Sequence, residues 1–294
     1  MAAGKELKRR IKSIKNTKKI TKAMELVSAS KMKRAIAATL ASRAYAGYSW
    51  EVLQSLAEYV SETQNPLLTV RPAKKMLVIL ITSNRSLCGG YNAQVTRKTI
   101  AFLREHVGQH IDFISVGSKG ESNLRRLGQN IVASFNTVSD TPKLADVYSI
   151  GNLALDMYKN GEYDRVYVAY TDFVSALTQL PQIATLLPVK REEVAAEIVE
   201  AKATAPKNAI NYTFEPDYET LMSMIVEKIA RMRVYQMILE STASEHSARM
   251  LAMKNASDAA GEMIDDLTLA FNKARQAGIT QEISEISAGM ASVS

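Results

Sequence analysis

The chain has 294 residues, 47% of them hydrophobic and 23% charged, so its composition is that of a globular protein and excludes wholesale disorder. Its formal net charge is +7, and its single cysteine, Cys88, excludes an internal disulfide bond and a thiolate zinc site. The longest strictly apolar run, Met76–Ile81, is far shorter than the roughly 20 residues of a membrane-spanning helix. We therefore expect no direct transmembrane segment, and the basic start lacks the apolar core of a secretory signal.

The positive charge is concentrated at the start of the chain. Residues 1–34 hold 12 Lys and Arg against two Glu, a charge of +10, so residues 35–294 total −3. Such a basic helix suits nucleic acid, an anionic membrane surface or acidic protein, and a transit peptide is a fourth interpretation. Residues 1–44 contain no Phe, Tyr or Trp to stack on bases or anchor in a membrane. An acidic protein partner is therefore favoured, and nucleic-acid binding is the alternative.

Two long helices are predicted at the ends of the chain. All seven prolines lie between residues 66 and 216, which leaves two proline-free flanks rich in helix-forming residues. We predict an N-terminal coiled-coil helix over residues 1–65 and a C-terminal one over 217–294, paired antiparallel because both join the same middle domain. At about 1.5 Å per residue, residues 279–294 would overhang the shorter helix by roughly 24 Å. This tip has isoleucines but no basic residue, so it needs an apolar sleeve or it frays.

A heptad seam of apolar residues is predicted along the C-terminal helix. Its members are Met253, Ala256, Ala260, Met263, Leu267, Ala270, Ala274 and Ala277. Traced backwards, the same seam passes the polar residues Arg249, His246 and Thr242. In the N-terminal helix, a seam begins at Leu7, Ile11 and Ile14 and is expected to drift to Ile20, Met24 and Val27.

Residues 66–190 are predicted to form a Rossmann-like α/β central domain with a largely parallel sheet, because short apolar strands alternate with helical stretches. Strands are expected at 76–81, 111–116, 131–135, 166–170 and 182–189, and helices at 92–107, 119–127 and 143–159. Residues 191–216 are expected to be a linker with a candidate edge strand at Ile210–Phe214. The fold class is therefore α/β, with a long antiparallel two-helix coiled coil formed by both termini.

The loops of this middle domain do not have the spacing of a catalytic or cofactor site. Residues 83–92 and 117–120 contain glycines after strands, but neither segment matches a dinucleotide fingerprint or a phosphate loop. Cys88 has no histidine at a recognisable spacing, and Gly108 separates His106 from His110. We expect a buried structural cysteine and neither catalytic residues, cofactor nor metal.

Several segments resemble the gamma-subunit family of F-type ATP synthases, the central rotor shafts of these enzymes. The resemblance rests on Ile11–Met32, Leu87–Gly90, Glu240–Asp258 and Asn272–Ile286, and it extends in order over essentially the whole chain. Two residues depart from the family pattern, Asn84 where Asp is usual and Ser86 where Gly is usual. These departures bear on the role of one loop and leave the resemblance intact.

The resemblance implies a non-catalytic subunit that couples proton flow through a membrane ring to ATP synthesis or hydrolysis by rotating. The implied partners are the alpha and beta subunits of the catalytic hexamer, the epsilon subunit and the membrane c-subunit ring. The implied location is peripheral, at the cytoplasmic face of a bacterial inner membrane. From their positions in the matching motifs, the resemblance implies that seven residues contact the catalytic subunits: Lys18, Lys22, Met24, Arg249, Gln276, Thr280 and Glu285.

Overall fold

The computed structural model describes residues 2–57, 66–189 and 218–293. The predicted linker, with its candidate strand Ile210–Phe214, lies outside the described residues. The described chain divides into two units, the first formed by Met1–Ser28 with Arg249–Ser294 and the second by Ala29–Ala248. None of the described helices has the combination of length and hydropathy needed to cross a membrane.

The second unit contains a five-stranded sheet in the order β3-β2-β1-β4-β5. Its strands are β1 (Lys75–Ile81), β2 (His110–Val116), β3 (Ile131–Phe135), β4 (Arg165–Phe173) and β5 (Gln179–Leu187). The first four pair in parallel, and β5 pairs antiparallel with β4. The prediction of a largely parallel α/β sheet is therefore confirmed, and the predicted strand 131–135 coincides with β3.

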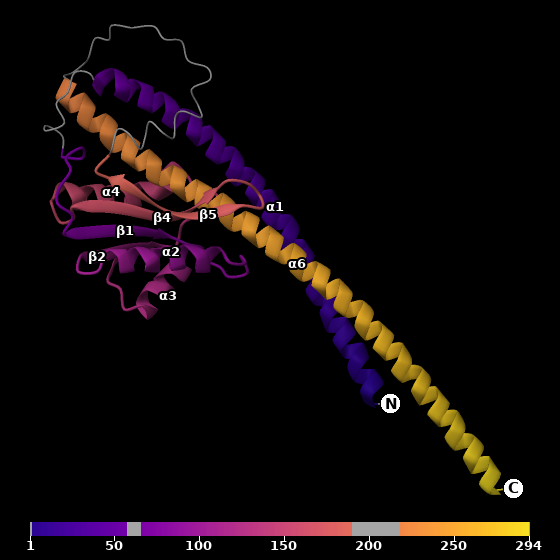
Figure 1. The fold of residues 1–294 in the computed structure, drawn as a ribbon. Coiled ribbons are helices and arrows are strands. Elements are labelled where there is room, and N and C mark those ends of the chain that lie inside the picture. The colour runs from indigo at the N-terminus through magenta and orange to yellow at the C-terminus, as the bar shows by residue number, and fades with distance from the viewer. Residues whose placement is uncertain (1, 58–65, 190–217, 294) are drawn as a thin grey trace. The chain divides into compact units, whose positions relative to one another are not determined.

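Helices cover both faces of this sheet (Figure 1). They are α2 (Tyr91–Glu105), α3 (Ser118–Arg126) and α4 (Leu144–Lys159). Alternate residues of β1 serve the two sides: Leu77 and Ile79 pack in a core with α4, whereas Val78 packs with α2 and α3. Because every side chain of β1 after Lys75 is buried, the strand reads as a continuous apolar run.

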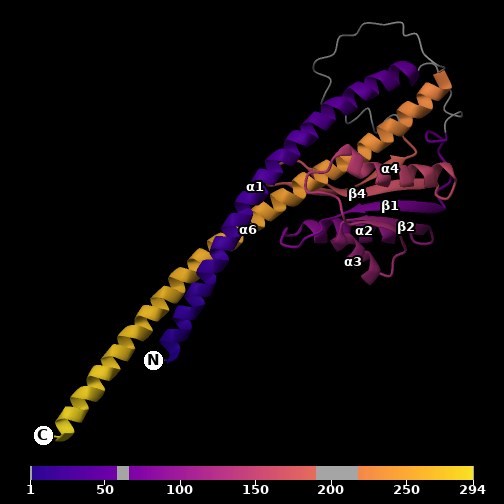
Figure 2. The same ribbon diagram turned by 180° about the vertical axis from the view of Figure 1, so that it is seen from behind.

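Two long helices complete the described chain, α1 (Ala2–Ala57) with 56 residues and α6 (Tyr218–Val293) with 76. In the first unit, the start of α1 and the end of α6 run side by side in opposite directions, and α6 continues past the N-terminus of α1 (Figures 1 and 2). The α/β fold with long terminal helices is therefore as predicted.

The seam of α1 differs from the prediction. Leu7, Ile11 and Ile14 are partly covered as expected, but Ile20 and Val27 are 60% and 55% exposed. Thr21, Ser28, Met32, Ala35 and Thr39 are buried instead, in steps of seven, four, three and four residues. The buried seam of α1 therefore continues through Thr21 and Ser28 and does not shift to Ile20 and Val27. Its small polar members allow close packing, and each threonine or serine hydroxyl is satisfied by a backbone carbonyl of its own helix.

The seam of α6 is half correct. Met253 and Ala260 are buried and Leu267 is partly covered, as predicted. Every second member of the seam lies one residue later than predicted. Ile264 is partly covered, whereas Met263, the predicted member, is 52% exposed. In the same way Ser257, Phe271 and Gly278 are more covered than Ala256, Ala270 and Ala277. A shift of one residue turns the helix face by about 100°, so the buried side carries the larger Ile264 and Phe271.

In the second unit, α6 is covered on nearly all sides between Val226 and Ala248. Val226, Ala230, Val234 and Ile238 join the core that contains α4 and one face of the sheet. The polar continuation of the predicted seam is also found, since His246 is buried within this unit. The helix is thus built into the α/β domain here, whereas in the first unit it has a single helical neighbour.

Candidate partner-contact surface

All seven predicted contact residues belong to the first unit, three on α1 and four on α6. On α1, Lys18 and Lys22 are exposed one helical turn apart, and Met24 is half-buried. The ammonium group of Lys22 donates to both carboxylate oxygens of Glu25, at 3.0 and 3.1 Å. Lys18 lies across α6 at Gly261, where an added Cβ would come within 2.7 Å of its Nζ. Gly261 therefore gives this lysine room to lie against the neighbouring helix.

The α6 members divide into an exposed group and one covered residue. Gln276, Thr280 and Glu285 are exposed, and Thr280 Oγ1 donates to the backbone oxygen of Gln276 at 3.0 Å. Glu285 accepts a hydrogen bond from Gln281 Nε2 at 2.9 Å. Arg249, by contrast, is only 8% exposed. The structure thus presents Gln276, Thr280 and Glu285 on open surface and covers Arg249.

Charge is distributed unequally between the two helices of the first unit. Exposed lysines and arginines run along α1, including Lys8, Arg9, Lys15 and Lys19. On α6, residues 258–266 carry four acidic side chains and no basic one, and all four are exposed. The basic character inferred from the sequence is therefore a property of the α1 side of this unit, which is suited to attract acidic protein segments.

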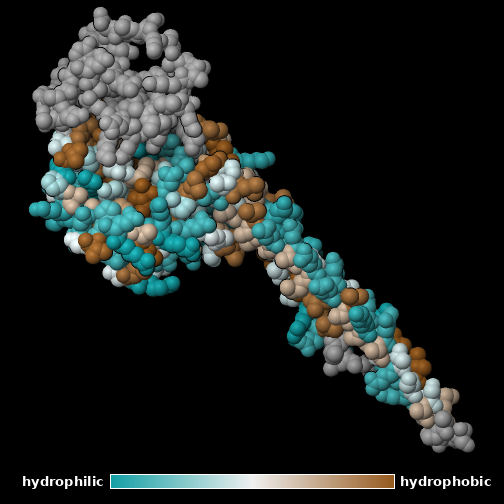
Figure 3. Space-filling view, viewed as in Figure 1, coloured by the Kyte–Doolittle hydropathy of each residue, from teal (hydrophilic) through white to brown (hydrophobic). Residues whose placement is uncertain are grey.

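The end of α6 exposes apolar side chains at helical spacing. Ile279, Ile283, Ile286 and Met290 are between 46% and 70% exposed. Along the part of this unit that Figure 3 presents, hydrophobic and hydrophilic side chains are interspersed. A helix whose bulky apolar residues remain open over several turns is the kind of surface that another protein covers.

In the loop after β1, Asn84, noted above as a departure from the family pattern, makes two hydrogen bonds. Its Oδ1 accepts a hydrogen bond from the backbone N of Ser118 at 3.1 Å, at the start of α3, as an Asp carboxylate would. Its Nδ2 also donates to the backbone oxygen of Val138 at 3.4 Å, which an Asp carboxylate could not do. The amide therefore keeps the helix-capping contact and adds a tie to the loop that follows β3.

Cys88 is buried, at 2% exposure, within the same loop. Its Sγ accepts from Asn92 Nδ2 at 3.2 Å and lies 3.6 Å from Ser83 Oγ. The two histidines considered with it in the sequence make other contacts: His106 contacts the Phe102 backbone oxygen, and His110 pairs with Asp112. The expectation of a buried structural cysteine agrees with this geometry.

A buried carboxylate, Asp112, lies within β2. It accepts hydrogen bonds from Tyr163 Oη at 2.7 Å and from Asn130 Nδ2 at 2.8 Å. Burial and this hydrogen bond to Asp112 raise the pKa of Tyr163 above its ordinary value, so the phenol stays protonated and donates. The cluster ties β2 to the loop before β4 and to the loop before β3. Within the described ranges there is no group of three side chains of the types that bind metal ions.

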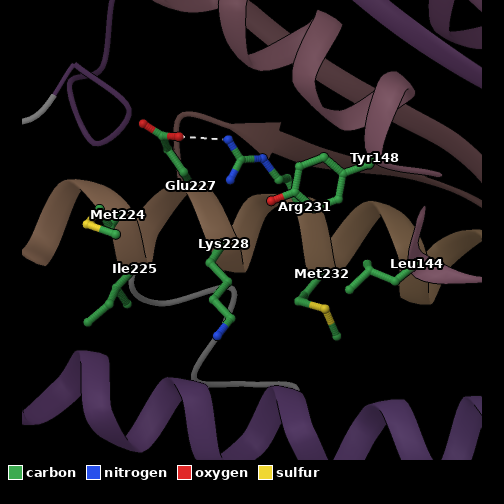
Figure 4. A pocket seen from close by; sticks show the side chains of 8 residues that line it. All are labelled: Leu144, Tyr148, Met224, Ile225, Glu227, Lys228, Arg231 and Met232. Atoms are coloured by element: carbon green, nitrogen blue, oxygen red, sulfur yellow. Dashed lines mark hydrogen bonds and ion pairs between the residues drawn. The ribbon is translucent and has the colours of Figure 1, made fainter. Parts of the chain in front are cut away.

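A pocket of about 800 Å³ lies between α4 and the first turns of α6 (Figure 4). Its charged groups are already engaged, because Glu227 accepts from Arg231 at 2.8 Å and forms a second ion pair with Lys159. Arg231 also donates to Asn152 at 2.7 Å and stacks over the Tyr148 ring at 5.1 Å. These groups join α4 to α6, and the described residues that line the pocket do not form a convergent set of catalytic side chains.

Two sets of polar contacts in the second unit were missed by the sequence analysis. Lys31 on α1 pairs with Asp140, and this hydrogen bond lowers the pKa of the Asp140 carboxyl. Three serines of α6, Ser241, Ser244 and Ser247, are buried against the sheet. The burial of the serines could have been predicted from their spacing, because they are small polar residues at steps of three in an otherwise apolar stretch of helix.

The chain was compared with protein families and with curated proteins. The family model described as ATP synthase matches residues 3–293. The chain is 39% identical over 296 residues to the ATP synthase gamma chain of Legionella pneumophila (strain Corby), covering all of both chains. It is 43% identical over 295 residues to the ATP synthase gamma chain of Acidithiobacillus ferrooxidans (strain ATCC 53993 / BNL-5-31), again covering both completely.

Two of the solved structures with a similar fold belong to mitochondrial ATP synthases. A chain of the Tetrahymena thermophila mitochondrial ATP synthase central stalk and c-ring is 26% identical, with a TM-score of 0.61, over 81% of this chain and 99% of that one. A chain of the Euglena gracilis OSCP/F1/c-ring assembly is 19% identical, with a TM-score of 0.67, over 99% of this chain and 95% of that one. At that identity, the Euglena match is evidence of a shared fold only.

Proposed function

We infer the function of this chain from the family to which it belongs, that of the ATP synthase gamma chains. It is the central rotor shaft of the enzyme. The observation that carries this conclusion is similarity at 39% to 43% identity over the full length of the relatives. Nucleic-acid binding, the alternative raised by the basic start of the chain, finds no support in these relatives.

We propose that the chain is a non-catalytic member of the complex and acts by mechanical and electrostatic contact. Two features support this proposal: Asn84 of the loop after β1 and Asn92 of α2 bond to their own chain, and exposed basic side chains run along α1 of the first unit. ATP would then form or break down on other subunits, as this one turns among them.

The proposed partners are the alpha and beta subunits of the catalytic hexamer, the epsilon subunit and the membrane c-subunit ring. The c-ring is supported by the Tetrahymena structure, which includes one with its central stalk. The bacterial relatives support a bacterial source, and hence a peripheral place at the cytoplasmic face of the inner membrane.

We further propose that the contacts with the catalytic subunits are made by Lys18, Lys22, Met24, Arg249, Gln276, Thr280 and Glu285. The exposure of Lys18, Lys22, Gln276, Thr280 and Glu285 supports this set. The isoleucines at the end of α6 would enter an apolar collar. Arg249 is the member that its own chain largely covers, so it is the weakest of the seven as a direct contact.

The decisive experiment is to assemble the chain with the alpha and beta subunits of its own organism and attach a probe to its α/β domain. During ATP hydrolysis the probe should turn in one direction, and the isolated chain should hydrolyse no ATP. Turnover by a contaminant-free preparation of the chain alone would refute the non-catalytic role. A chain that joins the hexamer but carries a stationary probe would refute the rotor role.

A further inference from the structure

Three serines of α6 lie along one side of the helix at successive steps of three residues. Ser241, Ser244 and Ser247 are each fully buried, at 0% exposure. Serine is a weaker helix former than alanine, and a buried hydroxyl without a partner costs about 1–3 kcal/mol. The bonds that these hydroxyl groups make offset this cost.

The first two serines bond to the end of β4. Ser241 Oγ lies 2.6 Å from Tyr91 Oη of α2 and accepts from the backbone N of Thr171 at 3.4 Å. Ser244 Oγ donates to the backbone oxygen of Thr171 at 3.2 Å. The pairing of β4 with β1 ends at Ala169, and the residue opposite Thr171 in β5 is Pro181, which has no N–H. The two serines thus bond both backbone polar groups of Thr171 just beyond the point where β1 stops.

The third serine bonds to the turn between β4 and β5. Ser247 Oγ donates to the backbone oxygen of Ala176 at 2.5 Å and lies 3.4 Å from Gln179 Nε2. Together the three hydroxyl groups connect two turns of α6 to α2, to the end of β4 and to the β4–β5 turn. We call this set of contacts the serine joint.

The serine joint differs in kind from the apolar contacts made earlier along α6. Val226, Val234 and Ile238 pack into the core, where attraction depends on buried area and has little directional preference. Hydrogen bonds weaken steeply when their distance or angle changes. The serine joint therefore adds directional bonds, to the end of β4 and to the β4–β5 turn, to the apolar packing that holds α6 on the sheet.

We propose that Ser241, Ser244 and Ser247 are positioning residues that transmit torque between α6 and the α/β domain. This inference rests on the rotor function proposed above. A shaft loaded by the catalytic subunits along its length must pass a twisting force to the domain into which it is built. The serine joint opposes rotation of α6 against the sheet because such rotation would stretch bonds to Thr171 and Ala176 together.

The test uses the assembled ATP synthase with its hexamer fixed to a surface and a probe on the α/β domain. The angular fluctuations of the probe during catalytic pauses report the torsional stiffness of the rotor. In Ser244→Ala/Ser247→Ala, we expect the variance of these fluctuations to rise about twofold, because directional contacts are lost while the apolar packing remains. The matched control is Ser257→Ala, which alters a buried serine of the same helix in the first unit and should leave the variance unchanged.

The outcomes separate this inference from the rotor function itself. If the wild-type probe does not turn, the rotor function fails. If it turns, but the double variant fluctuates as the wild type does, only the serine joint is refuted. If the double variant does not assemble, Ser247→Ala alone is measured, with a smaller rise expected. Failure of that single variant to assemble would make Ser247 a folding residue and overturn the proposal.

Discussion

The seam of α6 offers a sharp test, because neighbouring residues were assigned opposite roles by the sequence and by the structure. Ile264 is half-buried, whereas Met263, the residue predicted from the heptad pattern, is 52% exposed. Replacing a fully buried isoleucine by alanine costs about 2–5 kcal/mol. For the half-buried Ile264 we expect about 1–2 kcal/mol, and for Met263→Ala a change within about 0.5 kcal/mol.

Hydrogen exchange measured on peptides from residues 254–278 is the suitable assay, because it reports local opening of the first unit. A loss of about 1–2 kcal/mol corresponds to exchange roughly 5 to 30 times faster in Ile264→Ala. Met263→Ala serves as the matched control and should exchange at nearly the wild-type rate. Equal acceleration in both variants would refute the assignment of the seam, as would a faster rate in Met263→Ala alone.

Two further predictions concern the contact surface and the tie between Lys31 and Asp140. Glu285→Lys should lower ATP-driven proton pumping relative to ATP hydrolysis in inverted membrane vesicles, without loss of helix content. The control Glu282→Lys, which alters an exposed neighbour outside the proposed set, should leave this ratio unchanged. An equal loss of pumping in both variants would indicate a general charge effect. Because the hydrogen bond from Lys31 lowers the pKa of Asp140, the ion pair stabilises the folded chain above the ordinary Asp pKa and is lost as the pH falls through the lowered value. In urea unfolding, the free energy of unfolding of the wild type should exceed that of Asp140→Asn by less than about 1 kcal/mol, because the pair is partly exposed. This difference should shrink below about pH 4. A difference that grows there would contradict the assignment.

Much of the architecture could be predicted from the sequence because it depends on local patterns. Strands such as Ile131–Phe135 are short apolar runs between turn residues, and the absence of proline marks the two long helices. The resemblance of Ile11–Met32 and Glu240–Asp258 to known gamma subunits pointed to the family, which the comparisons with known proteins bear out. The contact residues drawn from those motifs, such as Gln276 and Thr280, remain a prediction.

The side of each long helix that faces its neighbour could not be read from the sequence. In α1 the bulky Ile20 and Val27 were favoured over Thr21 and Ser28, because apolar content was the only available criterion. The structure buries the smaller residues because a coiled coil follows a continuous heptad and rewards close approach. A single heptad pattern also does not distinguish Met263 from Ile264 when both are apolar.

The sequence by itself determined that this chain has two long helices, an α/β domain between them and its positive charge gathered on the first helix. Only the tertiary structure decided which residues those helices bury and what joins α6 to the sheet. Ser241 and Ser244 find their partner in Thr171, about 70 residues earlier in the chain. Such a pairing depends on where β1 stops beside β4, because beyond that point the backbone N–H and C=O groups of β4 have no partner in β1. A local sequence pattern does not predict where this happens.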